Sequence, residues 1–207
     1  MPALANLEPE PLWKHFDRLA AIPRASTKEA AAREYVWSVA TKLGLESKQD
    51  AVGNLVVRKP ARPGREATPM TLLQGHLDMV CEKNETTVHN FDKDPIKVVR
   101  DGDWLKADGT TLGADNGVGV AAALAVMESK DISHGPLEFA FTIDEETGLT
   151  GASQFAPGML KSKYYLNLDN EEIGTLCIGC AGGLNTTARR KVKLVPPAAG
   201  STWRMPA

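Results

Sequence analysis

Residues 137–148 have the sequence LEFAFTIDEETG, in which a largely apolar run ends directly in three carboxylates, Asp144, Glu145 and Glu146. A short apolar run bounded by turn-forming residues is typical of a buried β-strand. Open α/β sheets carry their chemistry just beyond the C-terminal ends of such strands. The stretch therefore predicts a strand of an α/β sheet with an acidic site at its end.

Three other short segments place polar groups after an apolar run or in a glycine-rich turn. They are GHLDMV with His76 and Asp78, LGADNGVG with Asp115, and LNLDNEE with Asp169. Together with the carboxylates at 144–146 they supply one imidazole and several carboxylates. This combination is typical of the scattered ligand set of a two-zinc hydrolase.

Each segment also has an ordinary structural explanation when it is taken alone. His76 and Asp78 point to the same face of an extended segment, so the aspartate could orient a metal-binding imidazole, or the two could be unrelated. Asp115 could bridge two cations or simply cap a helix. The carboxylates at 144–146 could divide metal binding and proton transfer between them, or form a solvated acidic loop. Asp169 could equally be a turn residue.

The pattern of apolar residues predicts alternating strands and helices. Strand-like runs occur at 54–58, 70–74, 96–100, 137–143 and 164–168, and helices are predicted at 11–20, at 118–127 and after the S-x-x-E capping box at Ser26–Glu29, ending near Gly44. We expect an α/β fold with a mixed, mostly parallel sheet sandwiched by helices. The domain prediction is 1–183 for the N-terminal part of a catalytic domain, and 184–207 for the start of a second domain or a non-native tail.

Composition and charge exclude several classes of function. The 207 residues carry a net charge of -2 and 43% hydrophobic residues, which is typical of a globular chain without affinity for nucleic acid or an anionic membrane. The N-terminus lacks a secretory pattern, so a cytoplasmic location is the expectation. Three cysteines, an odd number, argue against a disulfide framework. The remaining histidines, His15, His89 and His134, are interpreted as structural.

In this order the motifs are far more specific than any one of them. The strings LLQGHLDMVCEKN, DGTTLGADNGVGVAAALA, FTIDEETGLTGA and YLNLDNEEIGTLCIGCAGG resemble the zinc aminoacylase and carboxypeptidase superfamily. Within it the sequence is most similar to the cytosolic non-specific dipeptidases, also called Xaa-His or aminoacyl-histidine dipeptidases. The resemblance covers residues 7 to 185, and tripeptidase T is similar around Asp115.

The resemblance implies a role for each residue at a matching position. Asp115 would bridge two zinc ions, and His76 with Asp169 would complete the protein ligands of one of them. Glu146 would bind the other ion, while the catalytic roles fall to Glu145 as general base and to Asp78 as the support of His76. The family also has a cis peptide bond after the bridging aspartate, here Asp115–Asn116. The implied reaction is hydrolysis of dipeptides by a zinc-activated water, with cobalt or manganese as substitute metals.

The chain departs from the family in length. Family members are longer, and their remaining part supplies a lid domain, substrate-binding residues, the contact of a homodimer and a late histidine that ligates the second zinc. We therefore expect a truncated chain whose second metal position lacks its histidine and whose dipeptidase activity is low or lost. The alternatives are an inactive metal-binding fragment and a related tripeptidase or amidohydrolase. Dipeptide specificity and oligomeric state are not predicted.

Overall fold

The structure is a computed structural model that describes residues 2–170, 172, 174–179, 182 and 186–191. The chain divides into two compact units, residues 1–171 and residues 172–207. In the second unit, the described residues form neither helix nor strand. The predicted second segment, 184–207, lies outside the described residues except for 186–191.

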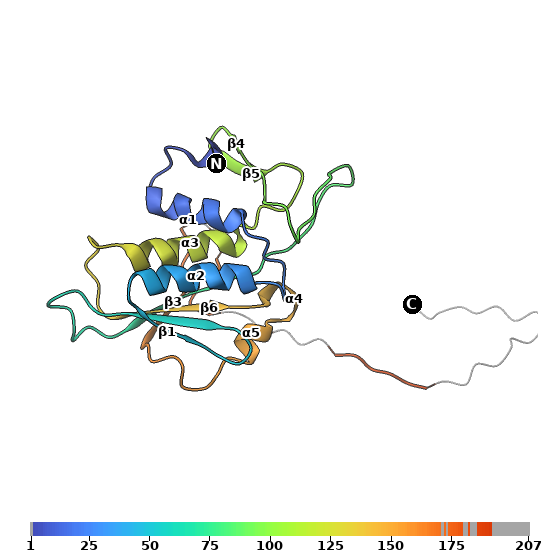
Figure 1. Cartoon of the computed structure of the whole chain (residues 1–207). Coiled ribbons are helices and arrows are strands. Elements are labelled where there is room, and N and C mark those ends of the chain that lie inside the picture. Colours follow the sequence, from blue (N-terminus) through green and yellow to red (C-terminus); the bar gives the residue numbers. More distant parts are fainter. Residues whose placement is uncertain (1, 171, 173, 180–181, 183–185, 192–207) are drawn as a thin grey trace, which may run out of the picture. The chain divides into compact units, whose positions relative to one another are not determined.

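A five-stranded mixed sheet forms the centre of the first unit, with strand order β1-β2-β6-β3-β7 (Figure 1). The strands are β1 (Glu46–Gln49), β2 (Leu55–Lys59), β3 (Thr71–His76), β6 (Leu137–Thr142) and β7 (Tyr164–Asn167). β3 runs parallel to both β6 and β7, whereas β2 is antiparallel to β6 and to β1. A separate hairpin consists of β4 (Val98–Asp101) and β5 (Trp104–Ala107).

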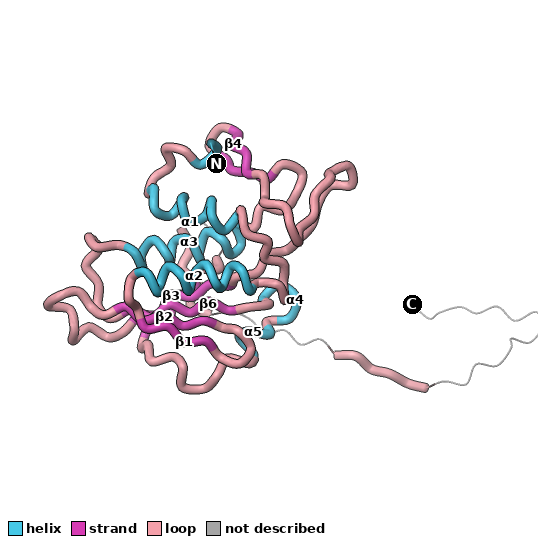
Figure 2. The backbone as a smooth tube through the Cα atoms, viewed as in Figure 1, coloured by secondary structure: helices cyan, strands magenta, loops and turns pink. Residues whose placement is uncertain are grey.

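Three helices lie on one face of this sheet (Figure 2). They are α1 (Glu10–Ala20), α2 (Ala30–Lys42) and α3 (Ala114–Glu128). α2 and α3 contact the sheet, and α1 packs on α3. Because α3 has neighbours on both sides, its almost wholly apolar sequence is buried around most of its circumference.

The other face has a thinner cover. Beyond β6, two short helices, α4 (Glu145–Gly148) and α5 (Thr150–Ser153), lead into the loop that precedes β7. Phe155 and Met159 from this loop pack on Val56, Leu72 and Ala140 of the sheet. The remaining helical turn, η1, spans Pro2–Leu4. No helix in the part of the chain that the structure describes is long and apolar enough to cross a membrane.

The predicted α/β fold with a mixed sheet is confirmed. β6 is buried at all six positions, as its apolar sequence predicts for a central strand. The predictions omitted β1 and β5, because the sequences ESKQ and WLKA carry too weak an apolar pattern. α2 occurs where it was predicted, but the capping box does not form, since neither Ser26 nor Glu29 caps this helix with its side chain.

Candidate metal centre

The sheet topology brings the four sequence segments together. β3 and β6 are parallel neighbours in register, with His76 paired to Thr142, so both strands end at the same edge of the sheet. His76 is the last residue of β3, and Glu145 and Glu146 open α4 just beyond β6. Asp115 lies in the first turn of α3, and Asp169 follows β7, the other parallel neighbour of β3.

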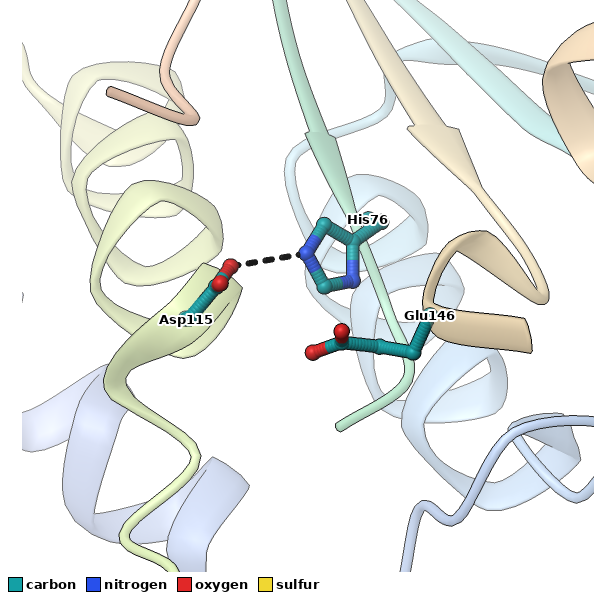
Figure 3. A group of neighbouring side chains, drawn as sticks. All are labelled: His76, Asp115 and Glu146. Atoms are coloured by element: carbon teal, nitrogen blue, oxygen red, sulfur yellow. Dashed lines mark hydrogen bonds and ion pairs between the residues drawn. The ribbon is translucent and has the colours of Figure 1, made fainter. Parts of the chain in front are cut away.

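The imidazole of His76 is fully buried and lies between carboxylates. Its Nδ1 is 3.2 Å from Oδ1 of Asp78. Its Nε2 is 2.9 Å from Oδ1 of Asp115 and 3.9 Å from Oδ2 of Asp169. Figure 3 shows the carboxylate of Asp115 beside the ring and that of Glu146 below it in this view. Nδ1 is thus paired with Asp78, while Nε2 faces the carboxylates of Asp115 and Asp169.

The electrostatics of the site reflect this crowding of carboxylates. Burial and the charge of Asp115 raise the pKa of Asp169 to about 6. The same two causes raise the pKa of Glu146. Burial disfavours a charged imidazole, but the hydrogen bonds to Asp78 and Asp115 outweigh it and raise the pKa of His76 to about 9. Without a cation, these carboxylates therefore favour a proton on His76.

Asp78 is fully buried and accepts hydrogen bonds from four groups. Oδ1 lies 3.2 Å from His76 Nδ1 and accepts the backbone N–H of Glu145 at 3.0 Å. Oδ2 accepts the hydroxyl of Ser26 at 2.8 Å and the backbone N–H of Glu146 at 3.1 Å. Burial alone would raise the pKa of Asp78, but these hydrogen bonds hold it well below its usual range. Asp78 is therefore an ionised carboxylate that fixes both β3 and the start of α4.

Asn116 was not among the predicted site residues, although it holds Asp169 in place. Its amide nitrogen donates to the carbonyl of Leu168 at 2.8 Å and lies 3.4 Å from Oδ1 of Asp169. The Asp115–Asn116 peptide bond is cis, as the resemblance implied. A Cβ atom on Gly75 would lie 2.2 Å from Oδ1 of Asn116, so the amide occupies space that only glycine leaves open. A Cβ atom on Gly119 would lie 2.6 Å from the same oxygen, so Gly75 and Gly119 are the sequence signals that could have indicated this close approach.

The donor set fits a divalent cation. His76, Asp115 and Glu146 each offer one ligand atom, and these atoms lie within 4.8 Å of one another. An imidazole nitrogen with carboxylate oxygens is the ligand chemistry that zinc accepts. A cation would also offset the repulsion that raises the pKa values of Glu146 and Asp169. The structure thus places all the predicted ligands in one region, and their individual metal-binding roles stay predictions.

The other histidines lie elsewhere. The ring of His15 is buried between the hydroxyl of Tyr35 and a carboxylate oxygen of Glu128, at 2.7 and 3.1 Å. His134 Nδ1 lies 2.7 Å from the carbonyl of Gly135, and His89 packs against Phe91. Cys81 and Cys177 are free thiols, and Cys180 lies outside the described residues.

Comparison with known proteins gives consistent results. Residues 72–192 match the model of peptidase family M20/M25/M40. The chain is 46% identical over 188 residues to the cytosol non-specific dipeptidase of Escherichia coli K12, which covers 91% of this chain and 39% of that protein.

Solved structures show the same relationship. The aminoacylhistidine dipeptidase of Vibrio alginolyticus superposes with a TM-score of 0.81 and 48% identity over 83% of this chain and 35% of that one. The aminopeptidase PepT of Bacillus cereus superposes with a TM-score of 0.66 and 27% identity over 79% of this chain and 44% of that one. The chain thus spans less than half the length of these relatives. By its motifs, its fold and these matches, the chain belongs to peptidase family M20/M25/M40.

Proposed function

We propose that this chain carries the metal centre of a dipeptidase that hydrolyses Xaa-His and other dipeptides, with zinc as the metal. The convergence of His76 Nε2, Asp115, Glu146 and Asp169 beyond the parallel strands β3, β6 and β7 carries this proposal. The names of the E. coli and Vibrio relatives supply the substrate class. The E. coli name also supports a cytoplasmic location for this chain.

Each residue of the site has one task in the proposed reaction. Asp78 accepts the Nδ1 proton of His76, which leaves the lone pair of Nε2 for a cation. His76, Asp115 and Asp169 would hold one ion, with Asp115 shared and Glu146 holding a second. When bound, a divalent cation supplies a Lewis acid that polarises the scissile carbonyl and lowers the pKa of water.

Glu145 is the proposed proton acceptor. Its backbone N–H is fixed by Asp78, while its side chain is partly exposed at the start of α4. Its charge contributes to the raised pKa values of both Glu146 and Asp169, so the carboxylate lies within electrostatic reach of the proposed ligands. From this position it would take a proton from the attacking water and return it to the departing amine.

A cavity of about 450 Å³ adjoins Asp115, Asn116, Leu168 and Asp169. This volume falls within the usual range for small-molecule sites, and apolar atoms make up most of its wall. Its position beside two proposed ligands favours it as the place where a small peptide would lie.

The test combines metal content with hydrolysis. We expect the purified 207-residue chain to bind zinc at micromolar free concentration, measured by competition with a chromophoric chelator, and His76→Ala to lose that binding. Hydrolysis of Gly-His, followed by chromatography of the products, should fall at least about 100-fold in Glu145→Gln with zinc binding retained. Glu34→Gln, on the exposed face of α2, is the matched control and should change neither quantity.

The outcomes separate the candidate functions. Zinc binding without turnover would support an inactive metal-binding chain, and faster cleavage of Ala-Ala-Ala than of Gly-His would support the tripeptidase alternative. A wild-type chain that binds no zinc would refute the proposed metal centre.

A further inference from the structure

The connection between α1 and α2, residues 21–29, packs against three segments that carry the proposed centre. Arg24 in this connection is only 2% exposed, although it carries a guanidinium group. Its Nη1 donates to the carbonyls of Leu77 and Asp78, at 3.1 and 2.8 Å, and its Nη2 donates to the carbonyl of Gly113. One side chain therefore joins the end of β3 to the turn that opens α3.

The backbone of the same residue strengthens this link. The carbonyl of Arg24 accepts the N–H of Met79 at 3.1 Å, and Ala25 forms an isolated parallel bridge with Met79. The segment that follows His76 is thus held from both the main chain and the side chain of residue 24. Arg24 also places a positive charge near Asp78, Asp115 and Glu146, where carboxylates outnumber cations.

Glu29 makes the corresponding link to the third segment. It is 3% exposed, and its Oε1 accepts the backbone N–H of Asp144 at 3.0 Å and that of Thr27 at 2.7 Å. Asp144 has a positive φ of 48°, a backbone conformation that non-glycine residues seldom adopt. Because Asp144 directly precedes Glu145 and Glu146, a bond that holds this turn also sets the direction of both carboxylates.

Glu29, Asp78 and Asp144 form a buried cluster whose oxygens lie close enough to hold a cation. Hydrogen bonds already account for this cluster. Both oxygens of Asp78 are used as described above, and those of Asp144 accept the hydroxyls of Thr147 and Thr150. The cluster is therefore better explained as a structural support behind the site than as a second metal site.

We propose that Arg24 and Glu29 are positioning residues of the metal centre: together they hold the segments around His76, Asp115 and Glu145–Glu146 at the spacing that a cation requires. This inference rests on the proposed function. It assigns the connection between α1 and α2 a role in the site, beyond that of joining two helices.

Zinc affinity of the 207-residue chain provides the test, since it does not depend on turnover. Arg24→Lys keeps the positive charge but loses the planar fork that reaches three carbonyls, so we expect zinc to bind about 10–100-fold more weakly. If Arg24 acted only through its charge, Arg24→Lys would bind zinc as the wild type does.

Two variants of Glu29 test whether its hydrogen bond or its charge matters: one removes only the charge, and the other removes the hydrogen-bond acceptor as well. Glu29→Gln loses the charge but keeps an oxygen that accepts the N–H of Asp144, so it should retain wild-type affinity. Glu29→Ala removes the acceptor and should weaken zinc binding by a similar 10–100-fold. This pair decides the question even if Arg24→Lys does not fold.

Arg58→Lys is the matched control. Arg58 is also a largely buried arginine, but it bonds Glu138 and Glu46 on the sheet. The control should lower the urea midpoint measured in EDTA and leave zinc affinity unchanged. Wild-type affinity in both Arg24→Lys and Glu29→Ala, or an equal loss in Arg58→Lys, would overturn the positioning role. Failure of the wild-type chain to bind zinc would instead overturn the metal centre, and this inference with it.

Discussion

Gly75→Ala is the substitution for which the structure gives the clearest expected cost. The added Cβ would lie 2.2 Å from Oδ1 and 3.4 Å from Cγ of Asn116, and 3.4 Å from Cγ2 of Val120. Atoms in contact normally lie about 3.5–4.0 Å apart, so the amide of Asn116 must move. Gly75 is on β3 beside His76, which leaves little freedom for the backbone to move instead.

Two losses contribute to the expected change in the free energy of unfolding. Forcing an extra methyl group into a packed site costs about 1–3 kcal/mol. Displacing Asn116 also removes its hydrogen bond to Leu168, which contributes about 1 kcal/mol. We therefore expect a loss of roughly 2–4 kcal/mol, which lowers the urea midpoint by about 1–2 M.

The assay is urea unfolding followed by circular dichroism in EDTA, with zinc affinity measured in parallel. Gly179→Ala is the control, because a Cβ at that glycine meets nothing within 4 Å. Unlike this control, Gly75→Ala should also weaken zinc binding, since Asn116 holds the segment that carries Asp169. A midpoint and an affinity equal to those of the wild type would refute the inferred link from Gly75 through Asn116 to Asp169.

Three further predictions concern other parts of the chain. Glu138 is fully buried and accepts hydrogen bonds from Arg58, from the backbone N–H groups of Lys161 and Ser162 and from the Ser162 hydroxyl. Glu138→Ala leaves these donors unpaired, so it should lower the free energy of unfolding in urea by about 3–5 kcal/mol. The loop at 156–163 should also become a site of proteolysis. Burial lowers the pKa of His15 below 6.5, so the unfolded chain binds its proton more readily and stability should fall as the pH drops through about 6.5; urea midpoints at pH 7.5 and 5.5 should differ less in His15→Gln than in the wild type. Zinc at 100 times its dissociation constant should stabilise the chain by about 2.7 kcal/mol, and an equal melting curve in EDTA and in zinc would contradict the metal centre.

The fold and the proposed ligands could be predicted because their signals are local in the sequence. The largely apolar run 137–143 is followed directly by the carboxylates at 144–146, and this pattern can be seen without knowing which strands lie beside it. In the structure the run forms the buried strand β6, with those carboxylates just beyond its end. The strand ESKQ at 46–49 gives no such signal, because it lies at the edge of the sheet and three of its four residues are exposed. Only the pairing with β2 makes it a strand.

Ser26 and Glu29 show why a correct local pattern can predict the wrong contacts. Their S-x-x-E spacing predicts a capping box, in which the two side chains bond the backbone at the start of the same helix. In the structure Ser26 bonds Asp78 and Glu29 bonds the N–H of Asp144, groups that are 52 and 115 residues distant in the sequence. Asp78 and Asp144 are both buried, and leaving a buried polar group short of a hydrogen bond costs more than leaving a solvated helix end uncapped.

Asp78 shows the same limit within the site itself. Its spacing from His76 predicts one bond, to the imidazole, and that bond is present. The spacing cannot predict that the same carboxylate also accepts the backbone N–H groups of Glu145 and Glu146. Because one buried anion fixes the imidazole on β3 and both carboxylates on α4, a shift of either element would move ligands on both sides of the centre. The relative placement of these groups therefore depends on the contacts that Asp78 makes with both segments, and neither segment's sequence alone predicts those contacts.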